Sequence, residues 1–204
     1  MNRLAKMGSV VAAMGFAVGI CGAAYAANIV VNGSFETGDT TGWTLSGNTG
    51  FFGVECPGAP FAGPGDGNCD LFAGPVGSIG TLSQNLATLP GRFYNINFDF
   101  RPDGGTPSFF SAVWDAQPAL FSVTNPAASA YQVLHFGAQA TSSSTSLSFN
   151  FRDDPGFLFL DSVSVAVPEP GSLALTGLAV LTALKYSRRR RLAAGSPPPL
   201  TRPV

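Results

Sequence analysis

The stretch that decides the fold is Tyr94-Asn95-Ile96-Asn97-Phe98-Asp99-Phe100-Arg101. Apolar and polar residues alternate strictly along it, four of each. Because successive side chains of a β-strand point to opposite faces, this pattern is typical of a strand with one face in the core and one toward solvent. The segment 146–152 repeats the alternation.

Nine further segments are predicted to be short strands: 29–32, 43–45, 49–54, 69–72, 80–86, 109–115, 119–124, 131–140 and 157–165. Asp154-Pro155-Gly156 has turn chemistry, so 146–152 and 157–165 are expected to pair as a hairpin. No stretch of 27–166 has a convincing 3.6-residue period. The sequence therefore predicts an all-β domain, an antiparallel β-sandwich of the jelly-roll type.

The charge of this domain restricts its partners. Residues 27–166 contain eleven acidic side chains, three arginines and no lysine, a net charge of −8 that the basic ends of the chain conceal. Such a surface repels phosphate backbones, so nucleic acid is not expected as a partner. Neutral glycans and metal-bridged contacts remain compatible with it.

The first 26 residues have the three parts of a secretory signal peptide. Arg3 and Lys6 are the basic region, 7–22 the apolar helix-forming core, and Ala24-Tyr25-Ala26 the small-residue cleavage site. The sequence therefore predicts export through the Sec machinery and a mature protein that starts after Ala26.

The C-terminal region begins where two prolines end the domain. Val167, Pro168, Glu169 and Pro170 are followed by the apolar run 171–184 and then by Arg188, Arg189, Arg190 and Arg191. As a helix, 171–186 would be roughly 24 Å long, short of the ~30 Å hydrocarbon core. The arginines should stay cytoplasmic, which places the domain outside. We expect a short transmembrane helix here and a disordered tail at 192–204.

This order of parts resembles the PEP-CTERM sorting signal of exported bacterial proteins, carried by Val167–Pro170, the apolar run and the arginine cluster. The resemblance implies transient anchoring in the inner membrane and cleavage by an exosortase. Release to the cell surface or extracellular matrix would follow. The 13 residues at 192–204 depart from the family, whose tails usually stop soon after the basic cluster.

Cys56 and Cys69 are the two cysteines of the mature domain. A lone pair in an exported domain most often forms a disulfide, and metal ligation would need more His or Cys partners than this sequence offers. Closing the 14-residue loop would contribute on the order of 3 kcal/mol in the chain-entropy model.

The ends of the domain carry a second resemblance. Asn32–Gly38 with Gly42-Trp43, and Leu160–Val165, resemble the opening and closing strands of carbohydrate-binding-module-like (galactose-binding-like) β-sandwiches. In that family the two motifs meet at a structural calcium site. The resemblance implies calcium ligands at Ser34, Glu36, Asp66, Asn68 and Asp161. The alternative is that Glu36 caps a turn, Asp161 hydrogen-bonds a loop and 66–70 is a solvated turn.

Catalytic signatures are absent from the sequence. His135 is the single histidine and lies in a predicted strand, without a serine-nucleophile motif. Asp153 and Asp154 are adjacent, so on a strand they face opposite ways and at a turn they are solvated. Neither arrangement gives the opposed pair of a glycosidase. We therefore expect that this protein is not an enzyme.

Two functions remain. In the first, the sandwich binds glycan or exopolysaccharide, with Trp114 and Tyr131 as candidate aromatic platforms for a sugar ring. In the second, it is a structural or adhesive surface protein that binds protein partners or itself. An exposed aromatic among polar neighbours would favour the first, and a flat apolar face or an unpaired edge strand the second.

Overall fold

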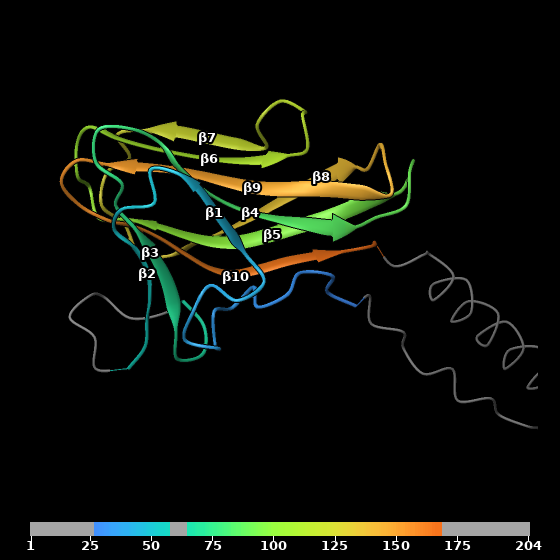
Figure 1. The fold of residues 1–204 in the computed structure, drawn as a ribbon, viewed down its shortest axis with the longest axis horizontal. Helices are drawn as coiled ribbons and strands as arrows, with labels where there is room; N and C mark the ends of the chain where they lie inside the picture. Colours follow the sequence, from blue (N-terminus) through green and yellow to red (C-terminus); the bar gives the residue numbers. More distant parts are fainter. Residues whose placement is uncertain (1–26, 58–64, 169–204) are drawn as a thin grey trace, which may run out of the picture.

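The strands form where the sequence alternates, and they build two five-stranded antiparallel sheets (Figure 1). The computed structural model describes residues 27–57 and 65–168. One sheet has the order β1 (Thr44–Gly47), β4 (Gly80–Ala87), β9 (Ser144–Asp153), β6 (Ser108–Trp114), β7 (Phe121–Thr124). The other has the order β2 (Phe52–Glu55), β3 (Asp70–Ala73), β10 (Leu158–Ala166), β5 (Phe93–Pro102), β8 (Gln132–Gln139). The predicted antiparallel β-sandwich is confirmed.

The strand order explains how the chain closes. Without β1 and β2, the two sheets have the strand orders β3-β10-β5-β8 and β4-β9-β6-β7. These are the strand orders of a jelly roll. Strand β2 extends the first of these sheets at its edge, and β1 extends the second. Residues 27 and 168 lie at the same end of the sandwich (Figure 1). The backbone joins them there, since the Ile29 N–H donates to the Val165 carbonyl at 2.9 Å.

The alternating residues of β5 and β9 fill the core. Tyr94, Ile96, Phe98 and Phe100 of β5 are all buried, as the alternation predicts. They meet the apolar face of the opposite sheet in ring contacts such as Phe98 with Phe149, whose centroids are 5.1 Å apart. The two sheets are thus held together in part by interdigitating aromatic side chains.

Two predictions about the strands are wrong. The segment 29–32 is not a strand, although it runs beside β10. The predicted hairpin does not form, because β9 pairs with β4 and β6 while β10 pairs with β3 and β5. Asp154-Pro155-Gly156 does turn the chain, but it carries it from one sheet to the other. Turn chemistry reverses the direction of a chain without deciding which sheet receives the next strand.

The predicted disulfide between Cys56 and Cys69 is confirmed, with the two Cα atoms 4.2 Å apart. It connects the end of β2 with the start of β3. These strands are antiparallel neighbours, with Glu55 opposite Asp70. The bridge therefore closes the long connection between them at its base.

Candidate functional site

The predicted calcium ligands come together around residues 65–69. The buried carboxylate of Asp161 accepts backbone N–H groups through Oδ2, from Gly65 at 3.0 Å and Asp66 at 2.8 Å. Glu36 accepts through Oε1 from the N–H groups of Asn68 at 2.7 Å and Cys69 at 2.9 Å. The two carboxylates therefore hold the two ends of one short segment.

These hydrogen bonds shape the electrostatics of the corner. Burial raises the pKa of Asp161 to about 6, against the lowering effect of the N–H groups of Asp66 and Ser162. The amides of Asn68 and Cys69 lower the pKa of the exposed Glu36 carboxyl. Ionised carboxylates that accept two amides are stabilised as anions.

The donor chemistry of this corner suits calcium, but the lone pairs are partly used. One oxygen of each carboxylate already accepts two N–H groups, and the second oxygen of Asp161 accepts the Ser162 N–H at 2.6 Å. An ion would therefore depend on the second oxygen of Glu36, the remaining lone pair of Asp161 and carbonyls. Among residues 27–57 and 65–168, no group of three or more His, Cys, Asp or Glu side chains is placed to hold a metal ion. The observed contacts are those of the alternative interpretation, and calcium at Glu36 and Asp161 stays a prediction.

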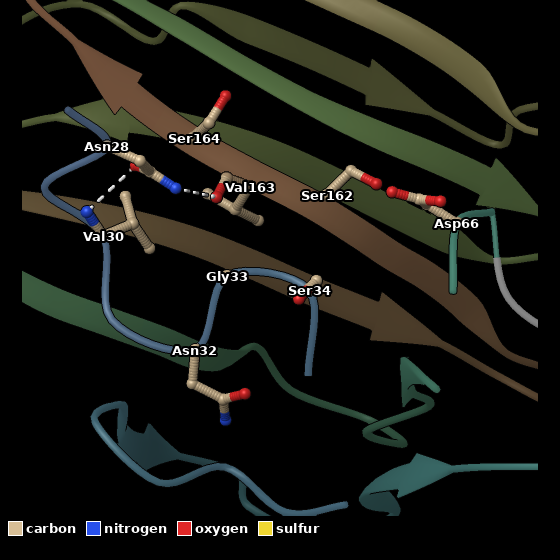
Figure 2. A pocket seen from close by; sticks show the side chains of 9 residues that line it. All are labelled: Asn28, Val30, Asn32, Gly33, Ser34, Asp66, Ser162, Val163 and Ser164. Atoms are coloured by element: carbon tan, nitrogen blue, oxygen red, sulfur yellow. Dashed lines mark hydrogen bonds between the residues drawn. The ribbon is translucent and has the colours of Figure 1, made fainter. Parts of the chain in front are cut away.

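A polar pocket of about 380 Å³ lies beside this corner, between residues 28–34 and β10 (Figure 2). Its lining includes the amide and hydroxyl side chains of Asn28, Asn32, Ser34, Ser162 and Ser164, together with Asp66. In Figure 2 the Ser162 hydroxyl and the Asp66 carboxylate point toward each other. The pocket thus gathers Ser34 and Asp66, two of the predicted ligands.

The pocket exists because a glycine lets two backbones meet. The Gly33 carbonyl accepts the Val163 N–H at 2.8 Å. A Cβ at Gly33 would lie 2.0 Å from the Val163 oxygen. Here β10 shifts register between Asp161 and Ser164, and Ser162 has a φ of 53°. The irregularity turns the Ser162 side chain away from the ladder and toward the pocket.

From this pocket a row of polar side chains crosses the outer face of the second sheet. Ser164 on β10, Asn97 on β5 and His135 on β8 are direct neighbours in register. The Asn97 Nδ2 donates to Ser164 Oγ at 3.3 Å, and Asn97 Oδ1 lies 2.7 Å from His135 Nδ1. The next row in register consists of Ala166 on β10, Asn95 on β5 and Gly137 on β8. Asn95 is exposed between these two small neighbours.

An exposed aromatic ring ends this face. Phe93 is 57% exposed and has the same strand parity as Asn95 and Asn97, so its ring lies on the outer side of β5. Opposite it on β8 is Gln139. We call this row of outward side chains the β5 strip, and it consists of Phe93, Asn95, Asn97, His135 and Ser164. It combines one flat apolar ring with amide, hydroxyl and imidazole groups.

Trp114 does not serve as a surface platform, contrary to the prediction. It is 0% exposed and packs in the core against Tyr94, with ring centroids 5.8 Å apart. Its indole N–H donates to the Gln139 carbonyl at 3.2 Å. The alternation of β6 places it inward with Phe110 and Ala112. The bulky indole is therefore a core residue.

Tyr131 belongs to the 65–70 corner. Its hydroxyl donates to the Asp70 carboxylate, and a Cβ at Gly65 would lie 3.2 Å from its ring. The Arg101 guanidinium lies 5.5 Å from the ring centroid and 3.8 Å from that of Phe159. Burial raises the pKa of both Asp70 and Tyr131. Tyr131 is thus half-buried and engaged, whereas Phe93 provides the exposed ring.

The sequence could have indicated Phe93. The strict alternation assigned 94–101 to a strand with Tyr94 inward, and one residue further back the same parity puts Phe93 outward. An aromatic at an outward position breaks the core pattern and is a reason to consider binding. Asn97 and His135 had no such signal, because their adjacency depends on the β5–β8 register.

The fold, an antiparallel sandwich of two five-stranded sheets, is similar to that of carbohydrate-binding modules. No protein-family model matches the chain. No curated protein matches it either. Solved structures do match it in fold, at identities that show the fold alone.

TmCBM61, solved in complex with β-1,4-galactotriose, matches with a TM-score of 0.57 and 16% identity, covering 70% of this chain and 99% of that one. A xylan-binding domain from CBM22 matches at 0.51 and 16%, covering 69% and 96%. The CBM22-1-GH10 modules of Clostridium thermocellum Xyn10B, solved with xylohexaose, match at 0.53 and 13%, covering 70% of this chain and 29% of that one.

The terminal predictions fall mostly outside the structure. The signal peptide 1–26, the apolar run with its arginines, and the tail 192–204 lie outside the described residues, which include only Val167 and Pro168 of the sorting motif. Within the described part, no helix is long and apolar enough to cross a membrane.

Proposed function

We propose that this chain is an exported, non-catalytic protein that binds glycan on the β5 strip. The observation that carries the proposal is the exposed ring of Phe93 on one sheet face with Asn95, Asn97 and His135. A sugar ring has a C–H face that stacks on an aromatic ring and hydroxyl edges that pair with amides. The strip offers both, as small-ligand sites generally do.

The charge of the domain favours a neutral polysaccharide. The net charge of −8 over 27–166 repels anionic polymers, while the strip contains no Asp, Glu, Lys or Arg side chain. The fold similarity to modules solved with galactotriose and xylohexaose supports a polymeric sugar. Neutral exopolysaccharide is the ligand class we propose.

Export is proposed from the two ends of the sequence. The signal peptide at 1–26 and the PEP-CTERM-like segment 167–191 support secretion, passage through an inner-membrane anchored form, and exosortase processing to the cell surface or matrix. The Cys56–Cys69 bridge fits an oxidising compartment outside the cytoplasm.

Affinity electrophoresis of the full-length protein tests glycan binding. Gels contain β-1,4-galactan, xylan or a neutral bacterial exopolysaccharide. We expect retardation in at least one gel, and a weakening of about tenfold in Phe93→Ala, which loses the stacking ring.

Phe51→Ala is the matched control. Phe51 is 65% exposed and adjoins β2, three strands away from β5 in the sheet, so its loss should not change the retardation. No retardation in any gel, or equal retardation of Phe93→Ala and the native protein, would contradict the proposal.

A second function is favoured by the edge strand β8. It lies at the end of its sheet, and Val133 on its outer face is 61% exposed. An exposed edge can add a strand from a protein partner or a second copy. A dimer in light scattering that Val133→Lys converts to monomer would support this adhesive role, and a monomer at all concentrations would exclude self-association.

A further inference from the structure

A carboxylate lies at the end of the core where an apolar residue would be expected. Along β9 the inward positions are Leu147, Phe149, Phe151 and then Asp153. Asp153 is 0% exposed, and neither carboxylate oxygen accepts a hydrogen bond from an N–H group or a hydroxyl. A buried ionised carboxylate without partners is costly, so this position calls for a compensating group.

The surroundings of Asp153 add negative charge. Burial is the main cause that raises its pKa to about 7, followed by the charge of Asp103, a side-chain hydrogen bond with Asp103 and the charge of Asp154. Arg152, next to Asp153 in the sequence, already pairs with Asp154 at 2.7 Å, and this is the ion pair found among the described residues. Among the described residues, no ion pair to Asp153 or Asp103 is found.

Oxygen atoms converge on one glycine at this place. A Cβ at Gly105 would lie 2.3 Å from Asp153 Oδ1 and 3.1 Å from the Pro155 carbonyl oxygen. Asp103 approaches from the β5–β6 loop, fixed by N–H groups of Gly105 at 2.8 Å and Phe157 at 2.6 Å. Each Asp103 oxygen accepts one N–H and keeps a lone pair for another partner.

We propose that Asp153, Asp103 and the Pro155 carbonyl bind a divalent cation, calcium by the chemistry of the donors. All the donors are oxygens, two of the three groups are carboxylates, and water can complete the six to eight ligands that calcium takes. The ion would tie the β9–β10 turn to the β5–β6 loop and so join the two sheets. The site is separate from the Glu36–Asp161 corner.

Thermal unfolding of the full-length protein at pH 8 tests the site, in 10 mM CaCl2 and in EDTA. Because the ion binds only the folded state, the melting temperature should rise by about 5–10 °C for a Kd near 0.1 mM. Asp153→Asn should abolish the part of this rise that Glu36→Gln retains and, in EDTA, be at least as stable as the native protein, because it removes the buried charge.

Two more variants make the result decisive. Asp103→Asn should also lose the calcium response, which covers the case of an Asp153→Asn protein that does not fold. Glu36→Gln is the matched control at the other corner and should keep the response. The proposal is overturned by a Glu36→Gln protein that does not respond to calcium, or by a response of Glu36→Gln that is unchanged when Asp153→Asn or Asp103→Asn is added to it.

Discussion

Removing the Cys56–Cys69 bridge should destabilise the sandwich mainly through the unfolded chain. The bridge closes a 14-residue loop, given a sequence separation of 13. The chain-entropy model gives about 3 kcal/mol for such a loop. With an unfolding entropy of roughly 2.1 cal/mol/K per residue over about 140 residues, this corresponds to a fall of about 10 °C in melting temperature.

The native contacts should survive this change. Glu36 holds residues 68 and 69 through backbone N–H groups, and β2 pairs with β3 along its whole length, so neither needs the sulfur atoms. The assay is melting by circular dichroism with and without tris(2-carboxyethyl)phosphine. The double variant Cys56→Ala/Cys69→Ala is the control and should melt at the reduced temperature in both buffers. A shift below about 2 °C, or loss of the far-ultraviolet strand signal on reduction, would refute the reasoning.

Three other predictions follow from the packing and the buried charges. Gly33→Ala should cost about 3 kcal/mol in denaturant unfolding, because its Cβ would lie 2.0 Å from a backbone oxygen of β10, whereas Gly137→Ala, with open space around it, should be near neutral. In EDTA the melting temperature should fall as the pH rises from about 5 to about 7. The raised pKa of Asp153 means that the folded state binds the extra proton, and Asp153→Asn should flatten this slope. Because Trp43 and Trp114 are both buried, tryptophan emission should be blue-shifted and resist iodide quenching, and strong quenching would restore Trp114 as a surface residue.

The alternation of the sequence predicted most strands because burial imposes a period of two on any strand with one wet face. It placed Tyr94, Ile96 and Phe98 inward correctly. The same rule, followed two residues past 151, also puts Asp153 inward, against the interpretation of a solvated turn. The alternation could not predict which strands pair, because no local pattern tells whether β10 joins the sheet of β9.

The candidate site was predictable only where it is local in sequence. Glu36, Asp66 and Asp161 stand in motifs, and the structure brings them to one corner through the 65–69 segment. The row of Ser164, Asn97 and His135 joins residues from three strands, and its existence depends on registers that only the folded sheet defines.

The most direct test of glycan binding on the β5 strip is an NMR titration of the full-length protein with the oligosaccharide of the best-binding polymer. Amide shift changes are followed residue by residue. We predict that the changes are confined to β5, β8 and β10, with the largest at Phe93, Asn95 and His135. Changes centred on the β1-β4-β9-β6-β7 sheet, or no changes at saturating sugar, would contradict the account.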